Sequence, residues 1–174
     1  MPVGEALGHR WADLDLADGA VSIRQTVVCV NHQVQFGTPK TAAGTRRVDL
    51  DDGTIARLKS HRHRQLQERL RMGEGWRDHD LVFSKVDGNP IHPERFSREF
   101  SRRVLRWGLP KLTLHGLRHT WATLALKAGV HPKVVQERLG HSNISITLNT
   151  YSHVTAGMQH NAAELVARSI RNVH

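Results

Sequence analysis

Glycine and proline residues divide most of this chain into short helical segments, and no other feature of the sequence limits its fold as much. Asp51 or Asp52 can cap a long helix that runs to about Met72, where Gly73 ends it. The apolar side of that helix consists of Ile55, Leu58, Leu66 and Leu70. The later breaks and caps predict helices over residues 93 to about 107, 115–127, 132–139, Ser142 to about Tyr151, and about 157–171.

β-Branched residues before the long helix predict a small sheet. Residues 21–30 are expected to form one strand, Asn31 and His32 can turn it back into a second strand over 33–36, and residues 46–50 form a third. The loop between the second and third strands carries Lys40. We therefore predict an α+β fold, a mainly helical domain with a small three-stranded antiparallel sheet near the N-terminus.

The charge balance indicates a polyanionic partner. The 174 residues contain 25 Lys and Arg against 16 Asp and Glu, a net charge of +9, and nucleic acid is the commonest soluble polyanion. The single cysteine, Cys29, excludes an internal disulfide. Neither a signal peptide nor an apolar run of membrane-spanning length is present, so we expect a cytoplasmic protein of one domain without a membrane partner.

The helix predicted after Pro93 has two distinct sides. Phe96, Phe100 and Val104 recur every four residues and are expected to face the core. The basic side consists of Arg95, Arg98, Arg102 and Arg106. This side is either a solvated surface or a set of DNA phosphate contacts, and the overall charge favours contact with DNA.

The last third of the chain holds the residues with chemical potential. His115 and Arg118 lie three apart, hence on one face of a helix, where a guanidinium and an imidazole can hold phosphate oxygens together. His141 follows Gly140, and Tyr151 is the only tyrosine in the chain. Each of these residues alone has an ordinary structural explanation, such as a helix cap or a core tyrosine. Their order together suggests covalent phosphoryl transfer to a phenol.

Metal chemistry is disfavoured. The acidic run beginning at Asp49 has Ser60 instead of Glu at the twelfth position of a calcium loop. His115 and His119 are spaced four apart, but Gly116 stands where the zinc-protease pattern needs Glu. We expect no metal and no other cofactor.

These segments resemble the tyrosine recombinase (phage integrase) family, specifically its C-terminal catalytic domain, over nearly the whole chain. The resemblance rests on Trp11-Ala-Asp13-Leu-Asp15, Pro39-Lys40-Thr41 with Gly44 and Arg46, Leu114-His115-Gly-Leu-Arg118-His119-Thr120, Leu139-Gly140-His141-Ser142, and Tyr151-Ser-His153-Val154. Gly116 stands where many members carry Asp, which we regard as a tolerated departure.

The resemblance implies a function and a role for each site residue. Tyr151 would attack the scissile phosphate and form a 3′-phosphotyrosyl link, and Lys40 would protonate the departing 5′ oxygen. Arg118 would clamp the phosphoryl oxygens, while His115 and His141 would hydrogen-bond them and help to move protons. The implied function is site-specific recombination or integration of double-stranded DNA without ATP or metal. Self-association on DNA is implied as well, in the tetrameric synapse of the family.

One catalytic group of the family pattern is missing. Members carry an arginine three residues before a glutamate, but Pro2 stands three residues before Glu5. The first segment of the catalytic domain and the N-terminal core-binding domain are also expected to be absent, through a truncated gene or a misplaced start codon. We therefore expect weak or no recombination. The alternatives are a non-catalytic module that binds DNA or a recombinase, and a DNA-relaxing enzyme with the same chemistry.

Overall fold

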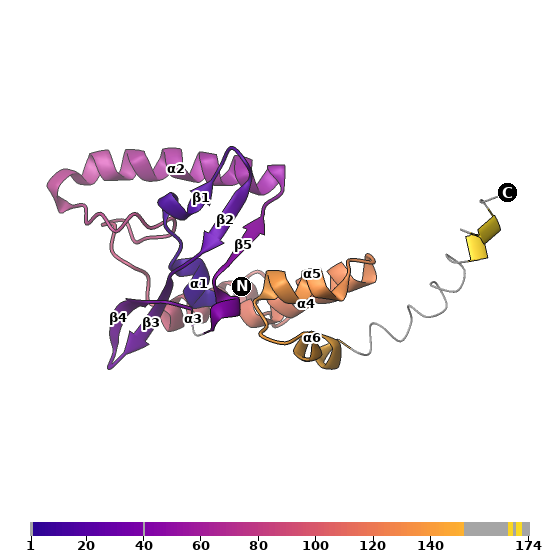
Figure 1. Cartoon of the computed structure of the whole chain (residues 1–174). Coiled ribbons are helices and arrows are strands. Elements are labelled where there is room, and N and C mark those ends of the chain that lie inside the picture. The colour runs from indigo at the N-terminus through magenta and orange to yellow at the C-terminus, as the bar shows by residue number, and fades with distance from the viewer. Residues whose placement is uncertain (1, 40, 152–166, 169, 172–174) are drawn as a thin grey trace.

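The first fifty residues form two separate antiparallel β-structures, seen at different heights in Figure 1. The computed structural model describes residues 2–39, 41–151, 167–168 and 170–171. A three-stranded sheet has the order β1–β2–β5, from Leu14–Asp15, Ala20–Ile23 and Arg46–Asp49. Strands β3 (Thr26–Val30) and β4 (Gln33–Gly37) form a hairpin of their own.

The single strand predicted over residues 21–30 is wrong, because the chain leaves the sheet at Arg24 and Gln25. The predicted turn is confirmed: Asn31 and His32 both have positive φ, of 48° and 61°, as a two-residue hairpin turn requires. This tight turn pairs Val30 with Gln33. The predicted second strand therefore pairs within the hairpin and not in the three-stranded sheet. The third strand of that sheet is β1, which the sequence did not predict.

Helix α1 (Val3–Leu7) packs against the backbone of β3. Gly4 within the helix and Gly8 directly after it allow this approach, because a Cβ on Gly4 would lie 2.5 Å from the Val27 oxygen and one on Gly8 would lie 2.8 Å from the Thr26 Cα. Leu7 and Val27 are buried at this contact region. The close packing brings Glu5 of α1 near the sheet.

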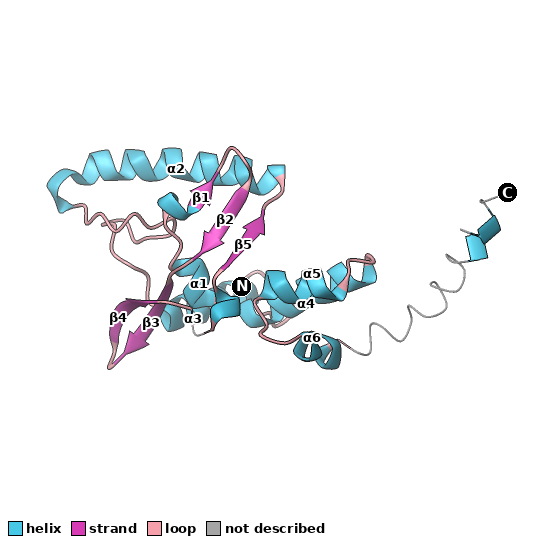
Figure 2. Ribbon diagram, in the orientation of Figure 1, coloured by secondary structure: helices cyan, strands magenta, loops and turns pink. Residues whose placement is uncertain are grey.

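Helix α2 (Asp52–Met72) runs along one side of the three-stranded sheet (Figures 1 and 2). Asp51 caps it by accepting a hydrogen bond from the Thr54 amide, as predicted. The predicted apolar side is wrong in its C-terminal half, where Leu66 is 49% and Leu70 82% exposed. A polar residue, Gln65, is buried there instead.

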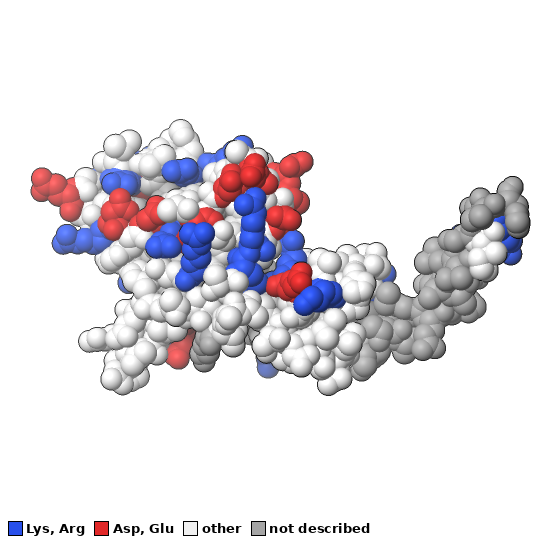
Figure 3. All heavy atoms as spheres, viewed as in Figure 1, with Lys and Arg blue, Asp and Glu red and all other residues white. Residues whose placement is uncertain are grey.

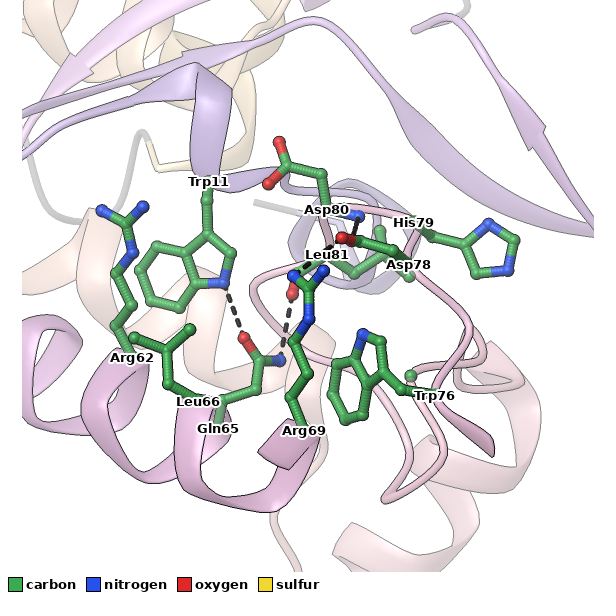
Figure 4. Close-up of a pocket in the computed structure, with 11 residues that line it drawn as sticks. Trp11, Arg62, Gln65, Leu66, Arg69, Trp76, Asp78, His79, Asp80 and Leu81 are labelled. Atoms are coloured by element: carbon green, nitrogen blue, oxygen red, sulfur yellow. Dashed lines mark hydrogen bonds and ion pairs between the residues drawn. The ribbon is translucent and has the colours of Figure 1, made fainter. Parts of the chain in front are cut away.

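Gln65 connects α2 to two distant segments. Its Oε1 accepts a hydrogen bond from the Trp11 indole at 2.7 Å, and its Nε2 donates to the Leu81 carbonyl at 3.1 Å. Figure 4 shows both contacts beside a small cavity of about 80 Å³. Trp11 belongs to a 3₁₀ turn, Trp11–Asp13. Two further such turns are Ala42–Gly44, before β5, and Gly73–Gly75, directly after α2.

Helix α3 (Pro93–Arg106) begins at the predicted proline. Val104 is buried, but Phe96 is 38% exposed, so only part of the predicted apolar side faces the core. All four arginines of its predicted basic side are exposed. Arg102 forms an ion pair with Glu99, and Arg103 also pairs with that carboxylate.

The last three described helices pack around a small core. They are α4 (Leu114–Lys127), α5 (Pro132–Leu139) and α6 (Ile144–Thr150). The buried residues of this core are Ala122, Leu126, Val135, Leu139 and Tyr151. Asn143, not Ser142, caps α6 by accepting from the Ser145 amide.

The final predicted helix lies mostly outside the described residues, which include only 167–168 and 170–171 of it, all helical. Within the described part of the chain, none of the helices combines the length and the apolar character that crossing a bilayer would demand.

Candidate active site

Tyr151 lies directly after α6, with its side chain directed into the core formed by α4 and α5. Its backbone N–H donates to the Thr147 carbonyl, and the residue is only 2% exposed. The hydroxyl oxygen lies 2.7 Å from Nδ1 of His119 on α4. The phenol is therefore held at the edge of the core against a polar partner.

The start of α4 determines which of its side chains meet Tyr151. The Thr113 hydroxyl accepts a hydrogen bond from the Gly116 amide and so caps the helix at this point. His115, Arg118 and His119 then occupy the first turns, where residues three or four apart share a face. The predicted His115–Arg118 pair is thus on one helix face, as the spacing requires.

Arg118 has one engaged and one unengaged guanidinium nitrogen. Its Nη2 donates to the Leu139 carbonyl at 2.7 Å. Its Nη1 is buried, and no hydrogen-bond partner for it occurs among the described residues. Burial lowers the pKa of Arg118, and nearby Arg46 acts in the same sense, whereas Glu5 and Tyr151 raise it. A buried donor of this kind suits a phosphate oxygen.

The C-terminal end of α5 is the point that two arginines share. Gly140 ends the helix in the left-handed conformation, with φ of 72°. Arg46 Nε donates to the Arg138 carbonyl at 3.1 Å, and Arg118 donates to the next carbonyl. Cations suit this position because the carbonyls at a helix C-terminus lack intrahelical partners. A Cβ on Gly140 would lie 2.5 Å from Arg46 Nη1, so the glycine also makes room for the guanidinium.

Arg46 connects this helix end to the N-terminal part of the chain. Its Nη2 lies 2.8 Å from Oε2 of Glu5, and its Nη1 donates to the Gly44 carbonyl at 2.8 Å. The side chains are 8% exposed for Arg46 and 11% for Glu5. This buried ion pair places one carboxylate beside two guanidinium groups, which offsets part of the repulsion between Arg46 and Arg118.

His141 is positioned by α6. Its Nδ1 lies 2.9 Å from Oγ1 of Thr147, which is fully buried. Burial lowers the pKa of His141, and the charges of Arg118, His119 and Arg46 lower it further. The imidazole is therefore biased toward its neutral form.

His119 lies within the motif around Arg118, but the sequence suggested it only as half of a discounted zinc pair and predicted no catalytic role for it. Its two ring nitrogens contact two predicted site residues: Nδ1 lies 2.7 Å from the Tyr151 oxygen, and Nε2 lies 2.7 Å from Nε2 of His115. The His115 and His119 rings meet edge to face at 4.4 Å between centroids. The spacing of four residues, which first suggested a metal pair, instead joins the two imidazoles.

The structure therefore brings together four predicted residues: His115, Arg118, His141 and Tyr151. The fifth, Lys40, lies outside the described residues. Arg95, Arg98, Arg102 and Arg106 lie on α3. On the face seen in Figure 3, acidic and basic side chains are intermixed over α2 and the three-stranded sheet, and the β3–β4 hairpin and α6 region are mostly uncharged.

A family model described as the phage integrase family matches residues 1–158, and curated recombinases and integrases are similar to this chain. A tyrosine recombinase XerC-like protein of Caldanaerobacter subterraneus subsp. tengcongensis is 34% identical over 173 residues, covering 92% of this chain and 44% of that protein. The integrase of Staphylococcus phage L54a is 27% identical over 165 residues, covering 91% of this chain and 46% of the phage protein. The chain thus spans less than half the length of these relatives.

A solved structure shares the fold. The integrase of transposon Tn1549, solved in complex with circular intermediate DNA, aligns with a TM-score of 0.77 and 24% identity over 95% of this chain and 56% of that chain. This likeness confirms the predicted fold class, a mainly helical domain with a small antiparallel sheet near the N-terminus.

Proposed function

This chain is a member of the phage integrase family, and from that premise we propose that it cleaves and rejoins strands of double-stranded DNA through Tyr151 in site-specific recombination. The observation that carries the proposal is the placement of a phenol beside a half-buried arginine. The Tyr151 oxygen is held by His119, and its charge interacts with that of Arg118, whose Nη1 is a buried donor without a partner among the described residues.

The chemistry follows from these groups. The Tyr151 hydroxyl gives up its proton as its oxygen attacks the scissile phosphorus, and the bond from phosphorus to the 5′ oxygen breaks, which leaves a 3′-phosphotyrosyl link. Arg118 and His141 stabilise the charge on the non-bridging oxygens. Lys40 protonates the 5′ oxygen, a role that rests on the family resemblance alone. Attack by the 5′ hydroxyl of a partner strand reverses the step.

The proposed substrate is supported by charge and by a relative. The chain carries a net charge of +9, and the Tn1549 integrase was solved with DNA. We assign phosphate contacts to the exposed arginines of α3, of which Arg102 is also paired with Glu99. Self-association on DNA, as in the family's tetrameric synapse, belongs to the same proposal.

Pro2 favours a second candidate, a non-catalytic module that binds DNA or a recombinase. Pro2 stands where the family pattern carries an arginine. Loss of one preorganised donor costs about 10²–10³ in rate in comparable sites. We therefore propose that this polypeptide cleaves DNA slowly. A larger loss of rate would leave only the non-catalytic candidate.

A nicked suicide DNA substrate tests the proposal, because cleavage then traps the covalent protein–DNA adduct. We expect slow adduct formation that survives denaturing electrophoresis and is abolished in Tyr151→Phe, which removes only the hydroxyl. DNA affinity measured in parallel should be the same for both proteins. An adduct that persists in Tyr151→Phe rules out this nucleophile. No adduct from either protein, with DNA binding retained, would favour the non-catalytic module.

A further inference from the structure

The contacts of His119 point to a catalytic role that goes beyond the residues discussed so far. We propose that His119 is the base that accepts the proton of the Tyr151 hydroxyl and passes its own Nε2 proton on to His115. The inference rests on the proposed function, since it concerns the same nucleophile. Its basis is a continuous chain of short contacts, 2.7 Å from the Tyr151 oxygen to His119 Nδ1 and 2.7 Å from His119 Nε2 to His115 Nε2.

The donor and the acceptor in each of these two hydrogen bonds follow from the chemistry of the phenol. A neutral imidazole has one N–H, so His119 donates at one end and accepts at the other. If His119 donated to the phenol oxygen, the phenolic hydrogen would need another acceptor, and none is found among the residues that the structure describes. Tyr151 therefore donates to Nδ1 of His119, and Nε2–H of His119 donates to His115.

A base is needed because the phenol is buried. Burial raises the pKa of Tyr151, and the charge of Arg118 offsets this only in part. The same surroundings prepare His119 to accept, because burial, His115 and Arg118 all lower its pKa and keep it neutral. The charged or titratable groups facing His119 are His115 and Arg118 on its own helix, Tyr151 after α6, and His141 before α6.

The step balances in protons and charge. The phenolic proton moves to Nδ1 of His119 as the oxygen attacks phosphorus, and the proton on Nε2 of His119 moves to Nε2 of His115. His119 ends neutral with its proton on Nδ1, and His115 becomes an imidazolium. Because His115 is exposed, its positive charge is solvated and the proton can leave to water.

The other two histidines of the candidate site do not contact the Tyr151 hydroxyl. His115 meets His119 rather than the phenol, and Nδ1 of His141 is engaged with Thr147. Among the residues that the structure describes, His119 is thus the histidine whose imidazole is in direct hydrogen-bond contact with the nucleophilic oxygen.

The variant His119→Asn distinguishes a role as a base from a role as a structural hydrogen-bond acceptor. The Asn Oδ1 can take the place of Nδ1 and still accept from the Tyr151 hydroxyl, but an amide does not take up a proton at neutral pH. His63→Asn is the matched control, because His63 is exposed on α2. Single-turnover cleavage of the suicide substrate is measured at saturating DNA across a range of pH, together with DNA affinity and thermal stability.

We expect His119→Asn to reduce the cleavage rate by at least about 100-fold at neutral pH. Its DNA affinity should stay within about twofold, and the defect should shrink as pH rises, because the phenol then ionises without a base. His63→Asn should match the wild type. A His119→Asn rate within a few-fold of wild type, or a defect that does not change with pH, overturns the proposal.

A second measurement separates failure of this inference from failure of the proposed function. Tyr151 is the only tyrosine, so ¹³C labelling of tyrosine gives one resonance for the nucleophile in the free protein. That resonance should follow the titration of His119 and lose this inflection in His119→Asn. If wild type forms no adduct yet the inflection is present, the contact exists but the function is wrong. If wild type cleaves and the inflection is absent, His119 is not the base.

Discussion

At the scale of single residues, buried polar groups decide how this protein responds to its surroundings. His9 lies just after α1 and is only 6% exposed. Burial lowers its pKa from 6.5 to about 4, against an opposing effect of Asp13, and Arg46 lowers it further. His9 is therefore neutral in the folded protein where it would be charged in an unfolded chain.

This difference predicts acid sensitivity. Below pH 6.5 the unfolded state binds a proton that the folded state takes up only near pH 4, so the free energy of unfolding falls as the pH drops through this window. The contribution of His9 is about 3 kcal/mol. In urea unfolding, the free energy of unfolding of His9→Gln should fall less than that of the wild type between pH 7 and pH 4, by about this amount. His63→Gln, at an exposed position, is the control, and equal pH dependence of His9→Gln and wild type would contradict the prediction.

At the scale of elements, the second half of α2 is joined to two distant segments by the hydrogen bonds of one buried polar residue, Gln65, which we call the polar anchor. Gln65 holds the indole of Trp11 and the Leu81 carbonyl, and its Nε2 also lies 3.0 Å from Oγ of Ser84. Leu66 and Leu70 beside it stay exposed. The position of this helix end thus depends on hydrogen bonds more than on apolar burial.

Gln65→Ala should destabilise the protein by roughly 2–3 kcal/mol, because it leaves the Trp11 indole N–H and the Leu81 carbonyl without their partner. Gln67→Ala is a matched control on the same helix, since Gln67 is exposed and its amide contacts the exposed His63. Chemical denaturation measures both variants. A loss of equal size in Gln67→Ala would mean that helix propensity, not the anchor, is responsible.

At the scale of the whole molecule, the Glu5–Arg46 pair joins the N-terminal part to the candidate active site. Arg46 of β5 contacts α1 through Glu5 and the end of α5 through the Arg138 carbonyl. The adjacent Leu139 carbonyl accepts from Arg118. The geometry around Arg118 therefore depends on segments separated by most of the chain.

Arg46→Met should cost about 3–5 kcal/mol of folding free energy, because it leaves the Glu5 carboxylate buried without its partner. Combining it with Glu5→Gln should restore part of that stability, as a double-mutant cycle would show. Arg47→Met provides the control on the same strand, since its side chain is 55% exposed and pairs with Asp18 at 3.5 Å. Additive effects of the two substitutions would show that the pair is not coupled.

The sequence by itself determined the features that depend on near neighbours. Asp51 caps α2, Pro132 begins α5, and Gly140 ends it, all as predicted, because caps and glycine conformations act within one turn of a helix. The spacing of His115 and Arg118 likewise placed them on one helix face. The order of motifs sufficed to identify the family.

Only the tertiary structure decided features that depend on contacts between distant segments. The split of residues 21–30 between two β-structures, the burial of Gln65 instead of Leu66, and the Glu5–Arg46 pair each require partners far along the chain. The contact of His119 with Tyr151, 32 positions apart, belongs to the same group. Periodicity reports which face of an element is apolar, but the groups that meet that face are set by packing in three dimensions.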